Sequence, residues 1–309
     1  MKVYRGIEEF EGKANYAVTT GTFDGVHIGH RTILDRLKQI AQKLDGESVL
    51  LTFYPHPRMV LQADSNLKLL NTIDEKTELL EAAGIDHLII HPFTKAFSRT
   101  TSLEFVRDIL VNQIGTKKLV IGYDHHFGRN REGSFDHLKE FGPLYGFEVE
   151  EIPAQDIDDV NVSSTKIRKA LVEGDVQTAN LYLGDAFQLR GEVVKGNQIG
   201  RTLGYPTANL DLGNPYKLVP ADGIYAVLVY LGKEQFQGML NIGMRPTLKE
   251  NQPKRSIEVN IFDFDRDVYG QELKLELIKR VRDEKKFNNL ENLKAEMEKD
   301  KVKCQNILS

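Results

Sequence analysis

Apolar residues in the first half of the chain follow two alternating periodicities. Residues 16–20 and 48–53 are short apolar or β-branched runs, typical of strands buried on both faces. Between them, residues 31–44 place aliphatic side chains on one face at helical spacing. The same pattern predicts strands at 87–90, 118–122 and 147–149, and helices at 74–83, from 102 and at 134–145, with Asp74 and Ser102 as N-caps. Strands alternating with helices predict an α/β domain, a parallel sheet with helices on both faces.

The second half has a different pattern. Apolar and polar residues alternate in short runs separated by turns rich in Gly, Asn, Pro and Asp, at 187–194, 225–230, 236–242, 256–262 and 273–277. Strands at this spacing predict a small antiparallel barrel or sandwich, followed by a helix at 290–300. Because a helical stretch at 164–183 closes the first half, we expect two domains, residues 1–185 and residues 186–309.

Length and composition agree with this organisation. The chain has 309 residues, enough for about two domains, and its 40% hydrophobic and 28% charged residues are typical of a globular protein. No run approaches the ~18 apolar residues of a membrane helix, and the charged first residues do not resemble a signal peptide. The one cysteine, Cys304, excludes an intramolecular disulfide, and its polar surroundings predict a surface thiol. We therefore expect a cytoplasmic protein.

The charge balance favours small-molecule partners. The chain has 41 basic and 45 acidic residues and a net charge of −4. Proteins that bind nucleic acid usually carry a basic surplus. We predict neither a nucleic-acid nor a membrane partner, and weak self-association stays open.

Residues 21–30, which read GTFDGVHIGH, link the first predicted strand to the first helix. Glycines let the backbone approach a ligand, and a helix N-terminus offers unpaired N–H groups to an anion. His27 and His30 are three residues apart and share one face, where they could stabilise charge on a phosphate during its transfer. The alternative is a glycine-rich turn with two solvent-facing histidines.

A second candidate phosphate site begins the helix at 164–183. Ser163, Ser164 and Thr165 are good helix caps and also phosphate ligands, and Arg168 adds a forked cation. An ordinary capped helix has the same local pattern, so the functional interpretation depends on its pairing with the histidine turn.

Residues 200–210 hold the most distinctive pattern of the second half. Thr207 and Asn209 are two residues apart, so in an extended segment they share one side. Hard oxygen ligands of this kind suit Mg²⁺ that carries nucleotide phosphates, although a plain turn is the alternative. The chain has neither a Gly-x4-Gly-Lys-Ser/Thr loop nor a Gly-x-Gly-x-x-Gly turn after a strand. A P-loop kinase, a dinucleotide-binding fold and a protein kinase are therefore not indicated.

The histidine turn, with Ser-Thr-Lys-Ile-Arg downstream, resembles the nucleotidyltransferase superfamily. Its longer form, Gly-x-Phe-Asp-Gly-x-His-x-Gly-His, resembles the bacterial bifunctional riboflavin kinase/FMN adenylyltransferases, or FAD synthetases. The resemblance implies a Rossmann-like nucleotidyltransferase domain that joins AMP from ATP to FMN and releases pyrophosphate. It implies catalytic roles for His27 and His30. The implied ATP and phosphate ligands are Gly21, Phe23, Asp24, Gly29, Ser163, Ser164, Thr165 and Arg168.

The second half resembles the riboflavin kinase domain across its length, including residues 191–210, 241–247 and 258–270. This implies a six-stranded barrel that transfers the γ-phosphate of ATP to the 5′-hydroxyl of riboflavin. Glu258 is the implied general base, and Thr207 and Asn209 are the implied magnesium ligands. Implied nucleotide-loop residues are Lys195, Gly196 and Arg201, and implied flavin contacts are Arg282, Glu284 and Phe287.

The chain departs from the family at three places. The family segment Gly-x-Asp-Phe-x-Phe-Gly corresponds to residues 122–128, where His125 replaces the first phenylalanine and Asp124 and Phe127 are the implied flavin contacts. A metal site there is disfavoured, because two adjacent histidines lack a third ligand. Tyr54 and Asn260 stand where Glu and His are common, and we expect a mild effect at Asn260.

The sequence thus predicts a bifunctional flavin enzyme whose partners are riboflavin, FMN, FAD and ATP, with Mg²⁺ as cofactor. One alternative is a riboflavin kinase with a weak or regulatory N-terminal domain, which the His125 departure motivates. Another is a non-enzymatic flavin or nucleotide sensor. A third is a relative of tRNA synthetases, disfavoured because the chain lacks a basic surplus and a Lys-Met-Ser-Lys-Ser segment.

Overall fold

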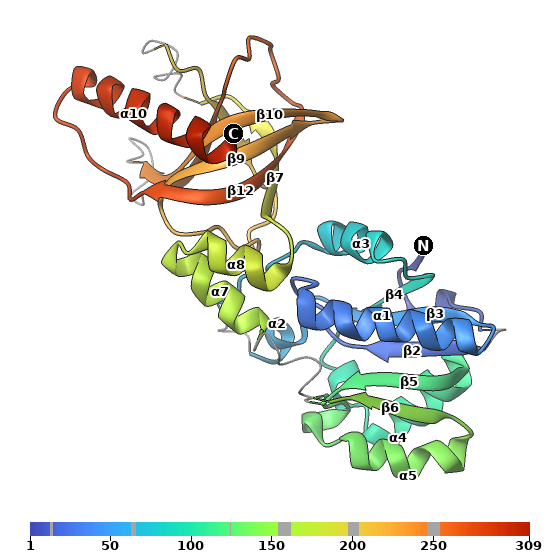
Figure 1. The fold of residues 1–309 in the computed structure, drawn as a ribbon. Coiled ribbons are helices and arrows are strands. Elements are labelled where there is room, and N and C mark those ends of the chain that lie inside the picture. The colour runs from blue at the N-terminus through green and yellow to red at the C-terminus, as the bar shows by residue number, and fades with distance from the viewer. Residues whose placement is uncertain (13–14, 63–65, 124, 154–161, 197–203, 246–253) are drawn as a thin grey trace. The chain divides into compact units, whose positions relative to one another are not determined.

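The computed structural model describes residues 1–309 apart from 13–14, 63–65, 124, 154–161, 197–203 and 246–253. The chain divides into two compact units, Met1–Ser164 and Thr165–Ser309, each with its own sheet and its own core (Figure 1). Within the described ranges, no helix has the length and apolar character needed to cross a membrane.

The first unit is built on a six-stranded sheet in the order β1-β4-β3-β2-β5-β6. All its strand pairs are parallel, which confirms the predicted sheet. The strands are β1 (Lys2–Tyr4), β2 (Tyr16–Thr20), β3 (Glu47–Tyr54), β4 (His87–Pro92), β5 (Thr116–Gly122) and β6 (Glu148–Ile152). The edge strand β1 was not predicted, because three residues with exposed Lys2 and Val3 carry no apolar run.

Helices cover both faces of this sheet, because its central strands bury alternate residues in two separate cores. Val49 and Leu51 of β3 join one core, whereas Leu50 joins the other, together with Leu34 and Leu37 of α1. The helical segments are η1 (Ile7–Glu9), α1 (Ile28–Lys43), α2 (Pro57–Leu61), α3 (Ile73–Ala82), η2 (Phe97–Arg99), α4 (Ser102–Glu104), the π-helical η3 (Phe105–Ile114), η4 (Arg129–Arg131) and α5 (Phe135–Tyr145).

Two predicted helix caps are wrong by one or two residues. Thr72, not Asp74, caps α3, and Thr101, not Ser102, caps α4. In both cases a glutamate three residues after the threonine bonds back to the N-cap N–H, which completes a capping box. The reciprocal pair satisfies two helix-end donors, so the threonine prevails over the nearby Asp or Ser.

The second unit contains a closed antiparallel barrel in the order β10-β11-β8-β7-β12-β9. Because β9 pairs with both β10 and β12, the sheet closes on itself, which decides for the barrel and against a sandwich. Its strands are β7 (Phe187–Val194), β8 (Ala208–Asp211), β9 (Gly223–Leu231), β10 (Glu234–Arg245), β11 (Lys254–Ile261) and β12 (Glu272–Arg282).

Two helices, α7 (Ser164–Glu173) and α8 (Val176–Leu183), are bonded to the barrel. The Asn180 amide donates to Leu277 O and accepts from Phe187 N, both at 2.8 Å. The backbone N–H of Ala221 donates to Leu171 O at 2.9 Å. The compact units therefore divide at residue 164, whereas the sequence places the functional boundary near 185, and that boundary stays a prediction.

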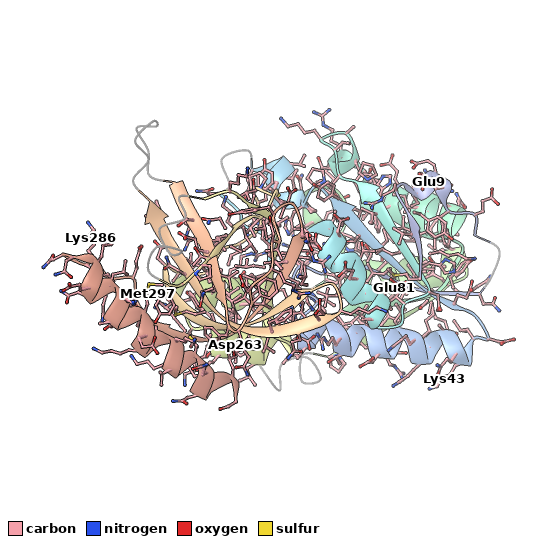
Figure 2. The ribbon with its side chains drawn as sticks, turned by 90° about the horizontal axis from the view of Figure 1, so that it is seen from above. Glu9, Lys43, Glu81, Asp263, Lys286 and Met297 are labelled. Atoms are coloured by element: carbon pink, nitrogen blue, oxygen red, sulfur yellow. The ribbon has the colours of Figure 1, made fainter. Side chains whose placement is uncertain are left out.

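The terminal helix α10 (Leu290–Leu308) is longer than the predicted 290–300. Cys304 is fully buried in a cluster with Ile224, Met239 and Phe262, against which Met297 also packs (Figure 2). The prediction of a surface thiol is therefore wrong. Its polar neighbours in the sequence lie on the outer face of a helix whose other face covers the barrel. Burial raises the pKa of the Cys304 thiol to about 12, so it stays protonated and unreactive at neutral pH.

Candidate active sites

The turn that follows β2 has a strained backbone. Phe23, Gly25 and Val26 have φ angles of 45°, 95° and 39°. Positive φ is unfavourable for phenylalanine and more so for β-branched valine, and such strain persists only where the surroundings enforce it. The turn lies at the carboxyl end of a central parallel strand, where α/β folds bind ligands. It contains the predicted residues Gly21, Phe23, Asp24, His27, Gly29 and His30.

His27 and His30 form a stacked pair at the start of α1. Their ring centroids are 3.6 Å apart with an interplanar angle of 14°. His27 is the N-cap residue, and its Nδ1 accepts a hydrogen bond from His30 N at 3.3 Å. Neutral His27 therefore carries its proton on Nε2, which leaves that nitrogen as a donor. The alternative of two solvent-facing histidines is wrong, because His27 is buried and His30 is half-buried.

The second histidine of the pair is held neutral. Burial, and then the neighbouring His27 and Lys76, keep the pKa of His30 well below its ordinary value of 6.5. Its Nδ1 is buried and has no hydrogen-bond partner in the described part of the chain. A neutral imidazole with an unused nitrogen is suited to bind a polar ligand atom.

Asp24 fixes the turn through hydrogen bonds with the backbone of residues 70 and 71. Its buried carboxylate accepts hydrogen bonds from Leu70 N at 3.1 Å and from Asn71 N at 3.2 Å. Ser164, the last residue of the first unit and part of the second predicted phosphate motif, donates from Oγ to Asp24 O at 2.9 Å. Ser163 is half-buried beside Ser164, whereas Thr165 and Arg168 follow on α7 in the second unit. Phosphate binding by these residues stays a prediction.

Sequence reasoning missed Lys76 on α3. This lysine is buried, and its Nζ donates to Thr22 O at 2.7 Å, directly before the strained residues. The available signal was weak: Lys76 lies three residues after Ile73 and four before Leu80, on the apolar side of its helix.

The loop after β5, which is predicted to bind flavin, has some of its side chains buried in the core. Asp124 lies outside the described residues. Phe127 is buried, with its ring centroid 5.6 Å from that of Phe105. The His125 ring is nearly parallel to Phe127 at 5.9 Å, and its Nε2 is shielded from solvent without a partner among the described residues. Burial, then His126 and Arg131, lower the pKa of His125 to about 4. His125 thus places a neutral, hydrogen-bonding ring where the family has an apolar one.

The second site lies on neighbouring strands of the barrel. Thr207 Oγ1 donates to Glu258 Oε2 at 3.4 Å, and Asn209 on β8 is directly paired with Glu258 on β11. Gly196 packs against Asn209, since a Cβ at Gly196 would lie 2.2 Å from Asn209 Nδ2. Strand register thus brings the predicted metal ligands and the predicted base together. Lys195 is exposed beside Gly196, and Arg201 lies outside the described residues.

The donor set here fits a nucleotide-bound magnesium ion. Thr207, Asn209 and Glu258 offer hard oxygen atoms, and Mg²⁺ is usually held by one or two protein ligands together with substrate phosphates. Among the residues that the structure describes, no group of three or more His, Cys, Asp and Glu side chains could form a protein-only metal cage. Asn260, where the family often has His, donates to Pro206 O at 2.7 Å and thereby supports Thr207.

The predicted flavin segment after β12 is tied to the helix and the barrel. Arg282 binds the buried Asp300 of α10 through Nε at 2.9 Å and Nη2 at 2.6 Å, and its guanidinium lies 5.9 Å from the Phe287 ring centroid. Glu284 accepts a hydrogen bond from Met244 N at 3.5 Å. The guanidinium of Arg282 is thus largely occupied by α10, and its direct contact with flavin stays a prediction.

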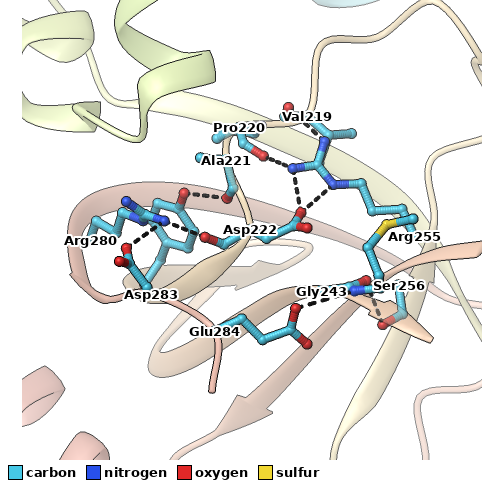
Figure 3. A network of polar contacts seen from close by, with 12 residues as sticks. Val219, Pro220, Ala221, Asp222, Gly243, Arg255, Ser256, Arg280, Asp283 and Glu284 are labelled. Atoms are coloured by element: carbon cyan, nitrogen blue, oxygen red, sulfur yellow. Dashed lines mark hydrogen bonds and ion pairs between the residues drawn. The ribbon is translucent and has the colours of Figure 1, made fainter. Parts of the chain in front are cut away.

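Figure 3 shows a further polar network at this rim of the barrel. Arg280 binds the Asp283 carboxylate at 2.9 Å and also donates to Asp222 O. Arg255 reaches the Asp222 carboxylate at 2.7 Å and Val219 O at 3.1 Å. Two arginines therefore fix the loop that precedes β9 and the start of the predicted flavin segment.

The strained histidine turn on a parallel sheet and the oxygen cluster on a closed barrel define a two-domain transferase of nucleotide phosphates. The FAD synthetase family model matches residues 10–166, and the riboflavin kinase family model matches residues 183–308. The chain belongs to the family of bifunctional riboflavin kinase/FMN adenylyltransferases, and it carries both domains of that enzyme.

Relatives match over nearly the whole chain. The bifunctional riboflavin kinase/FMN adenylyltransferase of Bacillus subtilis is 37% identical over 295 residues, covering 94% of this chain and 92% of the relative. That of Escherichia coli K12 is 34% identical over 305 residues, covering 98% and 96%. A crystal structure from Streptococcus pneumoniae, titled a macrolide-efflux protein, superposes with a TM-score of 0.89 at 30% identity, covering 99% of this chain and 98% of that one. These matches confirm the predicted family, fold class and enzyme class.

Proposed function

We propose that the chain makes FMN from riboflavin and ATP at the barrel site, and FAD from FMN and ATP at the histidine turn. The observation that carries this proposal is that the chain holds two separate constellations of the right chemistry. In the first unit these are stacked imidazoles at a helix N-terminus. In the second unit they are a carboxylate beside two oxygen ligands.

In the kinase reaction, Glu258 accepts the proton of the riboflavin 5′-hydroxyl as its oxygen attacks the γ-phosphorus, and the bond from that phosphorus to the ADP oxygen breaks. Thr207 and Asn209 would hold Mg²⁺, which when bound would neutralise charge on the nucleotide phosphates. Gly196 leaves room for the Asn209 amide, and nucleotide binding is assigned to Lys195, Gly196 and Arg201. Arg282, Glu284 and Phe287 hold the flavin.

In the adenylyl transfer, an FMN phosphate oxygen attacks the α-phosphorus of ATP, and the bond to the β-phosphate breaks to release pyrophosphate. The FMN phosphate is already ionised, so this step needs no general base. His27 donates a hydrogen bond from Nε2 to the phosphate oxygens that gain charge, and the neutral ring of His30 binds the same oxygens. Gly21, Phe23, Asp24 and Gly29 form the nucleotide-binding turn. Phosphate binding is assigned to Ser163, Ser164, Thr165 and Arg168, and flavin binding to Asp124 and Phe127.

A single time course tests both reactions. The purified chain is incubated with riboflavin, ATP and Mg²⁺, and the flavins are separated at intervals. We expect FMN to appear first and FAD to follow with a lag. FMN without any FAD would support the kinase-only alternative that His125 motivates, whereas bound but unchanged riboflavin would support a sensor. A cytoplasmic location also stays part of this proposal.

A further inference from the structure

Lys76 of α3 places a buried positive charge against the backbone of the histidine turn. The residue is only 7% exposed, and its Nζ donates to Thr22 O at 2.7 Å. Burial lowers the pKa of Lys76, while the charge of Asp24 acts in the opposite direction. An ammonium group is costly to bury, so a lysine at this position indicates a use that an apolar residue could not supply.

The ammonium holds the backbone at the start of the strained turn. Thr22 O accepts from Lys76 Nζ and also from Thr52 Oγ1 at 3.3 Å. Phe23 follows immediately with its positive φ. A carbonyl fixed by two donors, one of them charged, limits how far the strained backbone can relax.

The segment that contains Lys76 also binds the histidine turn at a second residue, Asp24. Leu70 N and Asn71 N donate to the Asp24 carboxylate, so residues 70–76 bind the turn on both sides of Phe23. The capping box between Thr72 and Glu75 fixes the first turn of α3, on which Lys76 sits. Residues 70–76 therefore hold residues 22–24 through contacts on both sides of Phe23.

The charge of Lys76 also acts on the reactive histidine. The titratable groups that act on His30 are His27, the N-cap residue of α1, and Lys76 on α3, and Asp24 in the turn acts on Lys76. Lys76 is one of the causes that lower the pKa of His30. A buried cation here also favours the negative charge that builds on phosphate oxygens during transfer.

We propose that Lys76 is a positioning residue for adenylyl transfer, which locks residues 22–24 in the strained conformation that aims His27 and His30. The proposal rests on the proposed FMN adenylyltransferase activity of the first unit. It assigns to α3 a part in the reaction that neither sequence motif includes.

The test uses the full chain, because its own kinase activity serves as an internal control. Lys76→Met is expected to lower kcat for FAD formation from FMN and ATP by about tenfold to hundredfold, the effect of misplacing reacting groups by about 1 Å. The rate of FMN formation from riboflavin is expected to stay within about twofold of the unsubstituted chain. Lys76→Arg, which keeps the charge and a donor, is expected to recover most of the lost kcat.

A pH profile separates positioning from mere structural support. Removing the charge raises the pKa of His30, so the acid limb of kcat for FAD formation is expected to move to higher pH in Lys76→Met and not in Lys76→Arg. Lys76→Gln, which keeps a donor without charge, decides the case if Lys76→Met lowers the Tm.

Three outcomes overturn or support the proposal without ambiguity. FAD formation at an unchanged rate and an unchanged acid limb overturns it. A fall of FAD formation that follows Tm in Lys76→Met and Lys76→Gln, with an unmoved acid limb, overturns it as well, since that is the behaviour of a purely structural lysine in a unit separate from the kinase site. A loss of FAD formation at unchanged Tm, with a moved acid limb in Lys76→Met and recovery in Lys76→Arg, supports it. Failure of the unsubstituted chain to make FAD instead refutes the proposed activity itself.

Discussion

In the first unit the predicted catalytic histidines are close neighbours in the sequence, and their rings stack directly after a turn with a strained backbone. In the second unit, Thr207 and Glu258 are 51 positions apart, and strand register brings them together. A short motif can therefore reveal the first site, whereas the second site exists only once the barrel closes. The first depends on one well-supported turn, and the second on several paired strands.

This difference predicts that each site can be broken without loss of the other. The largest effect is expected for Glu258→Gln, which keeps the size and hydrogen bonding of the side chain but removes its basicity. FMN formation from riboflavin should fall by about 10²- to 10⁴-fold, the usual contribution of a positioned general base. FAD formation from supplied FMN is the control and should be unaffected. An equal fall in both rates would show that the two sites are not separate.

The next largest effect is expected for His27→Asn. Asparagine is also a good N-cap residue, so α1 keeps its cap while the Nε2 donor is lost. We expect kcat for FAD formation to fall by about 10²- to 10³-fold, equivalent to about 2.7–4 kcal/mol in the barrier, as for loss of one oxyanion donor. The kinase rate and Tm should change little. A normal rate of FAD formation would exclude His27 from the reaction.

The ion pair behind the flavin segment is expected to matter through stability. Arg282 and Asp300 are 11% and 1% exposed, and Asp300→Ala removes the carboxylate that Arg282 binds at 2.6 Å, while Glu296 stays at 3.7 Å. We expect a loss of about 1.5–3 kcal/mol in the free energy of unfolding of the second unit, the usual contribution of a hydrogen bond to a charged group, with a raised KM for riboflavin. Asp283→Ala is the matched control, because Asp283 is 81% exposed and its pair with Arg280 is worth about 0–1 kcal/mol. Urea unfolding measures both, and equal losses would contradict the assignment.

The smallest effect is expected at His125. Its pKa is about 4 in the folded chain and 6.5 ordinarily, so the unfolded chain takes up a proton first as the pH falls. The contribution of neutral His125 to the free energy of unfolding is therefore present at neutral pH and should be lost as the pH falls from about 6.5 to 4. His125→Phe should reduce this loss, whereas the exposed His137→Phe should leave it unchanged. Identical pH dependence of unfolding in all three chains would disprove the burial of His125.

Much of the fold was predictable from the sequence because it rests on local periodicity. The central strands bury both faces, and the apolar face of α1 is plain in the sequence, so the parallel sheet and its longer helices were predicted, whereas the short β1 and α2 were not. Regular short strands predicted a barrel or a sandwich, and the family resemblance implied the barrel. Closure itself depends on β9 pairing with β12, a long-range contact that periodicity does not encode.

The features that were missed all depend on distant partners. Cys304 has polar neighbours in the sequence, and only the docking of α10 on the barrel buries it. Lys76 lies on the apolar side of α3, but nothing in the sequence places Thr22 O beside it. Arg282 matches a flavin-contact motif, but its ion pair with Asp300 appears only in the folded unit. Motifs identify candidate residues, whereas burial and long-range contacts determine what each of those residues does in the folded chain.

The central claim is that one chain carries two independent transferase sites. Mixing two variants tests it most directly: Glu258→Gln and His27→Asn are incubated with riboflavin, ATP and Mg²⁺, first separately and then together. We predict little FAD from either variant alone and clear FAD formation from the mixture, because FMN released by His27→Asn is adenylylated by Glu258→Gln. A mixture that makes no more FAD than the separate variants, while His27→Asn still releases FMN, would contradict the account.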